Sequence, residues 1–267
     1  VTLVSTANNH AWDYGRSALI ETLYNLNRVG VRSVGTGIDL AEATRIVSLD
    51  VKGMRIAWLA VTHVWNQGPI ELHEGRDHVA WADMKALAPI VAEARREHDF
   101  VVLSYHGGGE YQDEPAPPTE RFVAAAVDAG VDVVIGHHPH VVQGIGFRRG
   151  KPAFYSLGNL VFGVRPEHPW TRYGMLAKIT LSHASAPKVA ICPYGIGDFT
   201  PKPFTGPSGD VSRSLFLAHL KRASAFVGGA RYGEVDAAGC VEVSPPVIPP
   251  SAGPPRADPE ARPLARR

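Results

Sequence analysis

The sequence predicts an α/β protein built on mixed β-sheets, and three observations carry this prediction. Short β-branched apolar runs at Phe100–Leu103 and Val131–Ile135 have the length of buried strands. A helical stretch, Thr119–Ala129, lies between them, and strand–helix–strand is the pattern of parallel strands joined by a crossover helix. Elsewhere apolar runs are separated by tight turns, which is typical of antiparallel hairpins. Parallel and antiparallel pairing together indicate mixed sheets.

Strands and helices alternate through the first third of the chain. In the first expected helix, leucines recur at three- and four-residue spacing until Gly30 ends the run. Strands are expected where β-branched residues gather in short runs. The elements expected before Phe100 are a strand at Thr2–Ser5, a helix at Arg16–Arg28, a strand at Val31–Val34, a hairpin of Thr44–Asp50 with Met54–Val61, and a helix at Asp83–Glu97.

The segment His63–Ala82 shows no clear period, although it carries two tryptophans and three histidines. A stretch of this length without regular structure is typical of a binding loop or lid, and a floppy insertion is the alternative. We expect this loop and the segment Arg165–Tyr173 to border the functional cleft and to set substrate choice.

Beyond Ile135 the pattern continues with a further hairpin, two strands and a helix, and then the composition changes. The expected elements are a hairpin of Val141–Phe147 with Pro152–Leu157, strands at Met175–His183 and Lys188–Tyr194, and a helix at Ser212–Phe226. From Ser244 onward, eight prolines in 24 residues leave too little apolar surface for folding. The sequence therefore predicts one domain at residues 1–243 and a disordered proline- and arginine-rich tail at residues 244–267.

The amino-acid composition limits the class of protein to which the chain can belong. With 267 residues, of which 45% are hydrophobic, the chain can bury a core. The net charge of +1, without clustered lysines or arginines, argues against a nucleic-acid partner. No apolar run approaches the ~18 residues that span a bilayer, and Val1–His10 lacks the order of a signal peptide. Cys192 and Cys240 lie outside any cysteine cluster, so we expect two buried or idle thiols and no disulfide framework.

Histidines follow both strands of the predicted strand–helix–strand unit. His106 comes after the first, and His138 and His140 flank Pro139 after the second. Because parallel strands end at one sheet edge, these imidazoles are expected to meet there. If the backbone stays extended at Pro139, His138 and His140 share a face. Asn9-His10 also follows a predicted strand. Each histidine alone is more often structural, but the set together predicts a metal site.

Four stretches carry a family resemblance. They are ANNHAWDYG (Ala7–Gly15), HGGGEYQDEPAP (His106–Pro117), DAGVDVVIGHHPHVVQG (Asp128–Gly144) and YSLGNLVFG (Tyr155–Gly163). In this order they resemble the CapA family of capsule and poly-γ-glutamate biosynthesis proteins, within the calcineurin-like metallophosphoesterase superfamily. The resemblance covers most of the chain from Thr2 to about Tyr194. It implies a calcineurin-like four-layer α-β-β-α sandwich of two mixed sheets.

The resemblance also implies roles for individual residues. Divalent metal ions (Mn, Fe, Zn or Mg) would be the cofactors, held by Asn9, His106, His138 and His140. His10 would be the catalytic histidine that protonates the leaving group, and Asp13 and Glu110 would orient the histidines through hydrogen bonds. His137 falls on a position that the family leaves variable. Two ions about 4 Å apart would polarise the scissile group and activate a water.

The sequence departs from this pattern at its start. The superfamily places an aspartate, a histidine and a bridging aspartate before the asparagine block, but only eight residues precede Asn9 here, and none is acidic. The resemblance therefore implies an N-terminally incomplete domain, lacking its first strand and helix, from a longer protein or a truncated gene product. We expect an apolar strand face to be left unprotected, and at most one weakly bound ion.

Three functions follow from these observations. The first is a role in capsule or poly-γ-glutamate biosynthesis with a metal-dependent hydrolase site, active in the full-length form on a phosphoester or an amide-linked acidic polymer. The second is a non-catalytic accessory protein that binds the polymer, and the third is an inactive fragment. The implied partners are the acidic polymer or phosphoester substrate and capsule-synthesis membrane proteins, with no nucleic acid. The resemblance suggests the cell envelope, whereas the residues themselves leave compartment, substrate and oligomeric state open.

Overall fold

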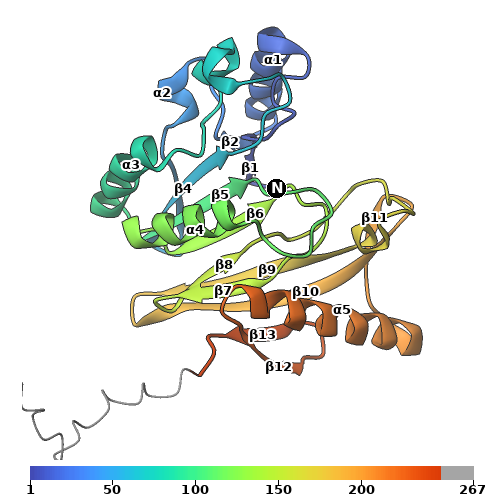
Figure 1. Ribbon diagram of the computed structural model, residues 1–267. Coiled ribbons are helices and arrows are strands. Elements are labelled where there is room, and N and C mark those ends of the chain that lie inside the picture. The colour runs from blue at the N-terminus through green and yellow to red at the C-terminus, as the bar shows by residue number, and fades with distance from the viewer. Residues whose placement is uncertain (248–267) are drawn as a thin grey trace, which may run out of the picture.

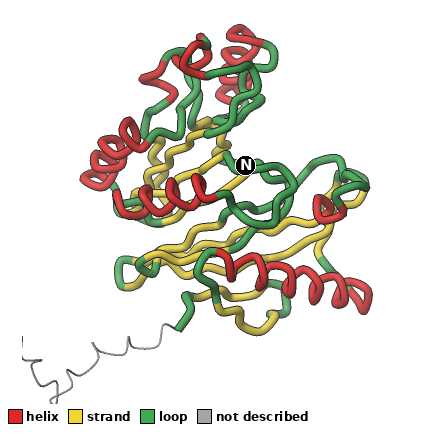
Figure 2. The backbone as a smooth tube through the Cα atoms, viewed as in Figure 1, coloured by secondary structure: helices red, strands yellow, loops and turns green. Residues whose placement is uncertain are grey.

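The computed structural model describes residues 1–247, which form two packed β-sheets, a small two-stranded sheet and flanking helices (Figures 1 and 2). The five α-helices of this part are α1 (Gly15–Arg28), α2 (Leu40–Ala43), α3 (Met84–Glu97), α4 (Pro117–Ala129) and α5 (Gly206–Phe226). The predicted domain boundary at residue 243 falls inside the last strand, and the predicted tail beyond residue 247 lies outside the described residues.

The larger sheet has six strands in the order β3-β4-β5-β6-β8-β7. Their bounds are β3 (Val47–Val51), β4 (Met54–Thr62), β5 (Phe100–His106), β6 (Val133–His137), β7 (Ile145–Arg148) and β8 (Lys151–Phe154). The four central strands are parallel, and the edge strands β3 and β7 are antiparallel to their neighbours. Helix α4 joins β5 to β6, so the predicted strand–helix–strand unit and the mixed sheet are both confirmed.

Helices α3 and α4 cover one face of this sheet. Leu87 and Val91 of α3 and Val123 of α4 are buried with Val101 and Leu103, which point from β5 toward the helices. Fully burying each such side chain contributes about 1.5–3 kcal/mol. This layer therefore fixes where the carboxyl ends of β5 and β6 lie.

The second sheet packs face to face on the first. Its strands are β9 (Tyr173–Ser182), β10 (Ser185–Gly197), β11 (Thr200–Pro203), β12 (Arg231–Val235) and β13 (Val241–Ser244). Met175, Ile191 and Val241 are buried in one cluster with Val102 and Phe154 of the larger sheet. All pairings in this sheet are antiparallel, whereas a mixed sheet was expected. Short connections such as that between β9 and β10 join neighbouring strands, which favours antiparallel pairing.

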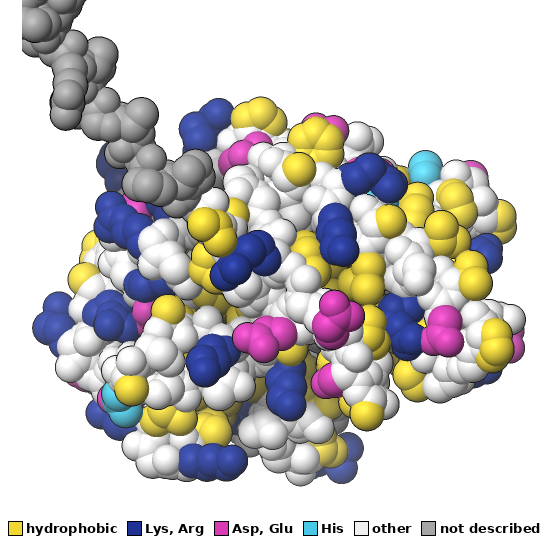
Figure 3. Space-filling view, turned by 90° about the horizontal axis from the view of Figure 1, so that it is seen from below, with side chains coloured by type: hydrophobic (Ala, Val, Ile, Leu, Met, Phe, Trp, Pro, Cys, Tyr) yellow, Lys and Arg dark blue, Asp and Glu magenta, His cyan; other side chains and the backbone are white. Residues whose placement is uncertain are grey.

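Helix α5 completes the core between the sheets. Phe216 and Leu220 are buried in the inter-sheet cluster, and the main-chain N–H of Ile145 in β7 donates to Ser224 Oγ over 2.9 Å. The helix therefore lies along the β7 edge (Figure 1). Seen from the side of α5 and β12, the surface carries basic, acidic and hydrophobic side chains interspersed (Figure 3). Within residues 1–247, no helix is long and apolar enough to cross a bilayer.

The prediction of two idle thiols is wrong, because Cys192 and Cys240 form a disulfide. Strand β13 runs antiparallel to β10 with Val241 opposite Ile191, which brings Cys240, the residue directly before β13, close to Cys192 of β10. The two Cα atoms are 4.1 Å apart although 48 residues separate them in sequence. Strand β13 was not predicted, so this pairing could not be expected from the sequence.

The amino-terminal part forms a third unit. Strands β1 (Leu3–Ser5) and β2 (Arg32–Val34) pair in parallel, with α1 between them. Trp12, which is 5% exposed, packs with Leu19 and Val34. The predicted loop His63–Ala82 contains two short 3-10 turns, η1 (Ile70–Leu72) and η2 (Glu74–Asp77), and Val79 joins the same cluster. The α/β class and the sandwich of two sheets are confirmed.

Candidate metal centre

The carboxyl ends of β5 and β6 meet at one sheet edge, as predicted. His106 lies opposite His137 in the parallel register, and Gly107 N–H donates to the His137 carbonyl over 3.0 Å. Gly136 allows this edge to form, because a Cβ there would lie 2.1 Å from the carbonyl oxygen of Tyr155. Only glycine lets β6 run this close to the neighbouring chain. The histidine-bearing turns therefore begin from a rigid edge.

Asn9 and His106 lie together although 97 residues separate them. Asn9 Oδ1 is 2.9 Å from His106 Nε2, and Asn9 itself is 4% exposed. The side-chain amide of Asn9 also donates to Asn66 Oδ1 over 3.1 Å. Two of the four predicted metal ligands therefore point at each other, and the second bond ties Asn9 to the His63–Ala82 loop.

His138 and His140 reach the same region through a turn. The ring centroids of His106 and His138 are 4.9 Å apart, and those of His138 and His140 are 6.2 Å apart. The expected extended backbone is wrong, because His138 has φ +101° and His140 has φ +62°. Strand β6 ends at His137, and the carbonyl of Pro139 accepts from Tyr111 N–H over 2.8 Å, which holds the turn. Left-handed backbone at non-glycine residues is costly and clusters at functional sites.

His10 is paired with Asp13 at the surface. His10 Nδ1 lies 2.7 Å from Asp13 Oδ2, and the His10 side chain is 63% exposed. Because a carboxylate only accepts, Nδ1 carries the proton and Nε2 faces outward. Asp13 Oδ1 also accepts from Gln67 Nε2 over 3.3 Å, so the His63–Ala82 loop supports this pair. The orienting role proposed for Asp13 would use this contact with His10.

Two other nearby acids, Glu110 and Asp113, form no hydrogen bond or ion pair with His106, His138 or His140 among the described residues. Among the described residues, Glu110 makes no hydrogen bond to a histidine, although its charge acts to raise the pKa of His138. Asp113 lies 3.9 Å from His219 Nε2, on α5. The orienting contact expected of Glu110 is therefore not present in this structure.

Burial keeps the imidazoles neutral. Burial, and then positive charge on His138, His137, His140 and His10, lowers the pKa of His106 to about 3. Burial lowers the pKa of His137 to about 4. The pKa of His138 is also lowered, mainly by burial. A neutral imidazole has a free lone pair, so these groups have the protonation state that a metal ion requires.

The donor set fits a divalent ion in chemistry but is not assembled as a closed shell. Two donors that bind one ion at about 2.0–2.2 Å lie about 3 Å from each other, as Asn9 Oδ1 and His106 Nε2 do. Across residues 1–247, however, no three His, Cys, Asp or Glu side chains gather into a group that could hold a metal ion. The remaining donors, on His138 and His140, would have to move toward this pair.

Three residues that support the proposed ligands were not predicted from the sequence. His140 Nδ1 lies 2.8 Å from Asn159 Oδ1, and Asn66 and Gln67 contact Asn9 and Asp13. Asn159 stands in the YSLGNLVFG stretch, where its polar side chain in an apolar setting was a usable signal. Asn66 and Gln67 carried no such signal in the His63–Ala82 loop.

Both predicted bordering segments lie beside the histidines, but not all their aromatic residues face the site. Trp12 is surrounded by Trp65, His73 and His78, with ring centroids 5.2–6.5 Å apart. These three side chains therefore contribute to packing. In the second segment, His168 stacks on Tyr111 with centroids 4.0 Å apart. Tyr111 in turn stacks against His140 at 5.8 Å.

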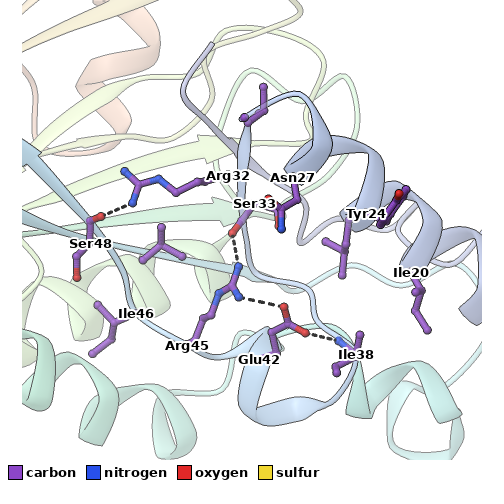
Figure 4. Close-up of a pocket in the computed structure, with 14 residues that line it drawn as sticks. Ile20, Tyr24, Asn27, Arg32, Ser33, Ile38, Glu42, Arg45, Ile46 and Ser48 are labelled. Atoms are coloured by element: carbon purple, nitrogen blue, oxygen red, sulfur yellow. Dashed lines mark hydrogen bonds and ion pairs between the residues drawn. The ribbon is translucent and has the colours of Figure 1, made fainter.

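Two hollows of similar size lie in this half of the molecule. One, of about 730 Å³, runs along β1 to His106 and His137, and its wall includes Ser104 Oγ, which has no hydrogen-bond partner among the described residues. The other, of about 670 Å³, lies between α1, β2 and β3 (Figure 4). There Arg32 donates to the Ser48 carbonyl and Arg45 pairs with Glu42, so the charged groups are already paired. None of the predicted site residues lines the second hollow.

Comparison with known proteins gives a consistent result. Residues 1–164 match the family described as bacterial capsule synthesis protein PGA_cap. The chain is 34% identical over 237 residues to the PGA biosynthesis protein CapA of Bacillus subtilis, covering 88% of this chain and 60% of the relative. It is 32% identical over 209 residues to the capsule biosynthesis protein CapA of Bacillus anthracis, covering 76% and 50%. The chain thus spans about half the length of these relatives.

Among solved structures, the NAD nucleotidase NadN of Haemophilus influenzae is similar to 81% of this chain. The match covers 46% of that protein, with a TM-score of 0.46 and 11% sequence identity.

Proposed function

The chain belongs to the bacterial capsule synthesis protein PGA_cap family, and from this premise we propose that it acts in the synthesis of an acidic capsule polymer of the poly-γ-glutamate class. We further propose that it does so through a metal-dependent hydrolase site. The first part is supported by the relatives that are named for PGA and capsule biosynthesis. The second part is supported by the side chains at the sheet edge.

The observation that carries the hydrolase proposal is that Asn9 and His106 lie close to His138 and His140 at the carboxyl edge of the larger sheet. Asn9 with His106, at 2.9 Å, supplies an amide oxygen and an imidazole, and His138 and His140 complete the proposed ligand set. A divalent ion held there would act as a Lewis acid on the substrate and lower the pKa of a nearby water. Mn, Fe, Zn or Mg suit these nitrogen and oxygen donors in different degrees.

His10 is the proposed acid–base residue. Its Nδ1–H is held by Asp13 at 2.7 Å, so its Nε2 faces solvent with the ring in one orientation. A positioned imidazole of this kind transfers a proton to or from a reacting group, which typically contributes 10²–10⁴-fold in rate. His10 adjoins Asn9 in the chain, so it would stand close to the proposed ion without being a ligand.

A second function, polymer binding without catalysis, is favoured by one specific observation. Among residues 1–247 no carboxylate gathers with His106, His138 and His140 into a group that could hold an ion and balance its charge. An accessory protein would use the same edge, the Tyr111–His168 stack and Arg165, which lies 5.7 Å from the Tyr111 ring, to hold an anionic chain.

The test measures cleavage and binding side by side. The protein is incubated with Mn²⁺ and either poly-γ-glutamate or bis(p-nitrophenyl) phosphate, and polymer length or released nitrophenol is followed. We expect slow turnover that His10→Ala lowers at least about 100-fold. The matched control His183→Ala, at an exposed histidine 3.9 Å from Asp99, should leave it unchanged. Polymer binding without any cleavage would favour the accessory function, and neither binding nor cleavage would contradict both.

A further inference from the structure

Asn159 makes two side-chain hydrogen bonds that together define its orientation. Its Nδ2 donates to the main-chain carbonyl of Thr171 over 3.1 Å, and its Oδ1 lies 2.8 Å from His140 Nδ1. A main-chain carbonyl can only accept, so the amide nitrogen must face Thr171 and the amide oxygen must face His140. An amide oxygen also only accepts, so the proton between Asn159 and His140 belongs to Nδ1.

The surroundings keep this arrangement rigid. Asn159 is 7% exposed and Thr171 is 1% exposed. The main-chain carbonyl of Asn159 accepts from the Tyr194 hydroxyl over 2.7 Å, which anchors the residue to β10 independently of its side chain. Thr171 Oγ1 accepts from Arg165 N–H and donates to the His168 carbonyl over 2.7 Å. A side chain held on both sides in this way has little freedom to release His140.

We propose that Asn159 is a positioning residue that holds His140 in its Nδ1–H tautomer and leaves the Nε2 lone pair free for a divalent ion. The ligand role of His140 rests on the proposed function, whereas the tautomer does not. A ligating histidine commonly donates its second ring N–H to a fixed acceptor, which sets the ring orientation and raises its basicity. Asn159 meets that description through its Oδ1.

The same network links His140 to the segment that borders the site. Thr171 holds both Arg165 and His168, and His168 stacks on Tyr111, which lies against His140. A substrate that moves Arg165 or His168 would therefore pull on the carbonyl that orients Asn159. Asn159 thus connects the segment Arg165–Tyr173 to the proposed ligand His140.

The first test reads the tautomer directly in metal-free protein. Long-range ¹H–¹⁵N correlation spectra distinguish Nδ1–H from Nε2–H imidazole, and His140 is assigned by comparison with His140→Asn. We expect the Nδ1–H form in the wild type, a shift toward Nε2–H in Asn159→Leu, and the wild-type form in Asn159→Asp, whose carboxylate restores the acceptor. Tyr194→Phe is the matched control, because it removes the hydrogen bond to the main-chain carbonyl of Asn159, keeps both side-chain hydrogen bonds and should leave the tautomer unchanged.

The second test measures Mn²⁺ binding by calorimetry with the same variants. Asn159→Leu should weaken binding about 10–100-fold, and Asn159→Asp should restore most of it. An Nε2–H tautomer in the wild type would overturn the proposal without any variant, and so would an unchanged tautomer in a folded Asn159→Leu protein. If the wild type shows the Nδ1–H form but binds no Mn²⁺, the proposed function fails while the positioning role stands.

Discussion

At the scale of single residues, two histidines of the cluster, His106 and His137, stay uncharged in the folded protein. Burial lowers the pKa of His106 to about 3 and that of His137 to about 4, below the ordinary value of about 6.5 for an exposed histidine. Both side chains therefore stay neutral where an unfolded chain would take up protons. This feature prepares the donors for an ion, but it makes folding sensitive to acid.

The free energy of unfolding of the metal-free protein is predicted to fall as the pH drops below about 6.5. Below that pH the histidines of the unfolded chain bind protons, whereas His137 and His106 in the folded chain stay neutral. Their contribution to the free energy of unfolding is therefore fully present above pH about 6.5. It is lost progressively as the pH falls to about 4 for His137 and about 3 for His106. Each histidine contributes a slope of at most about 1.4 kcal/mol per pH unit. Urea unfolding between pH 7 and 5 measures this slope.

His137→Asn should flatten that slope, because the side chain that resists protonation is gone. Carboxylates titrate below this range, so the comparison with wild type between pH 7 and 5 isolates the histidine. The exposed His183→Asn serves as control and should keep the wild-type slope. An identical slope in His137→Asn and wild type would show that the buried imidazole is not held neutral.

At the scale of elements, sequence reasoning succeeded where the pattern is local. The unit from β5 through α4 to β6 was predictable, because each strand is a short β-branched run and the crossover fixes parallel pairing. The turn at Pro139 was not, because the positive φ values of its flanking histidines depend on the Tyr111 N–H that the turn receives.

Elements that depend on distant partners also escaped prediction. Strand β13 has only four residues and forms through its pairing with β10 and β12, and the disulfide at Cys240, directly before this strand, could not be predicted for the same reason. In the candidate site, the proposed ligands could be named from their motifs. Their supports Asn66 and Gln67 could not, because each meets its partner only in three dimensions, and Asn159 stood out in its apolar stretch although its partner His140 could not be named.

Trp12 is predicted to hold the loop that carries Asn9, His10 and Asp13. It is 5% exposed and packs against Trp65 and His78, with ring centroids 6.5 and 5.2 Å away. Trp12→Ala should lower the free energy of unfolding by about 3–5 kcal/mol, since it leaves a large cavity. Thermal and urea denaturation measure the change, and the exposed Tyr14→Ala is the control. A loss below about 1 kcal/mol would mean that the aromatic cluster is not structural.

The disulfide is predicted to stabilise the second sheet. Replacing Cys192 and Cys240 together by alanine should cost about 2–4 kcal/mol, because the crosslink closes a chain segment of 48 residues. Reducing agent should lower the stability of wild type by a similar amount and leave the double variant unchanged. Equal stability of wild type and the double variant under oxidising conditions would contradict this role.

At the scale of the whole molecule, the site is assembled from segments that span most of the chain. The turn after β1 supplies Asn9 and His10, the ends of β5 and β6 supply three imidazoles, and Asn159 comes from the stretch before β9. The packed sheets hold these segments at one edge. Four uncharged donors cannot balance a pair of divalent ions, which usually needs a bridging carboxylate.

The central claim is that Asn9, His106, His138 and His140 together bind a divalent ion. It is tested most directly by titrating the purified protein with Mn²⁺, counting bound ions by elemental analysis after dialysis, and repeating both with His106→Ala and His140→Ala. We expect at most one weakly held ion per chain, lost in both variants and retained in His183→Ala. Binding that survives both variants, no binding in wild type, or two tightly held ions per chain would contradict it.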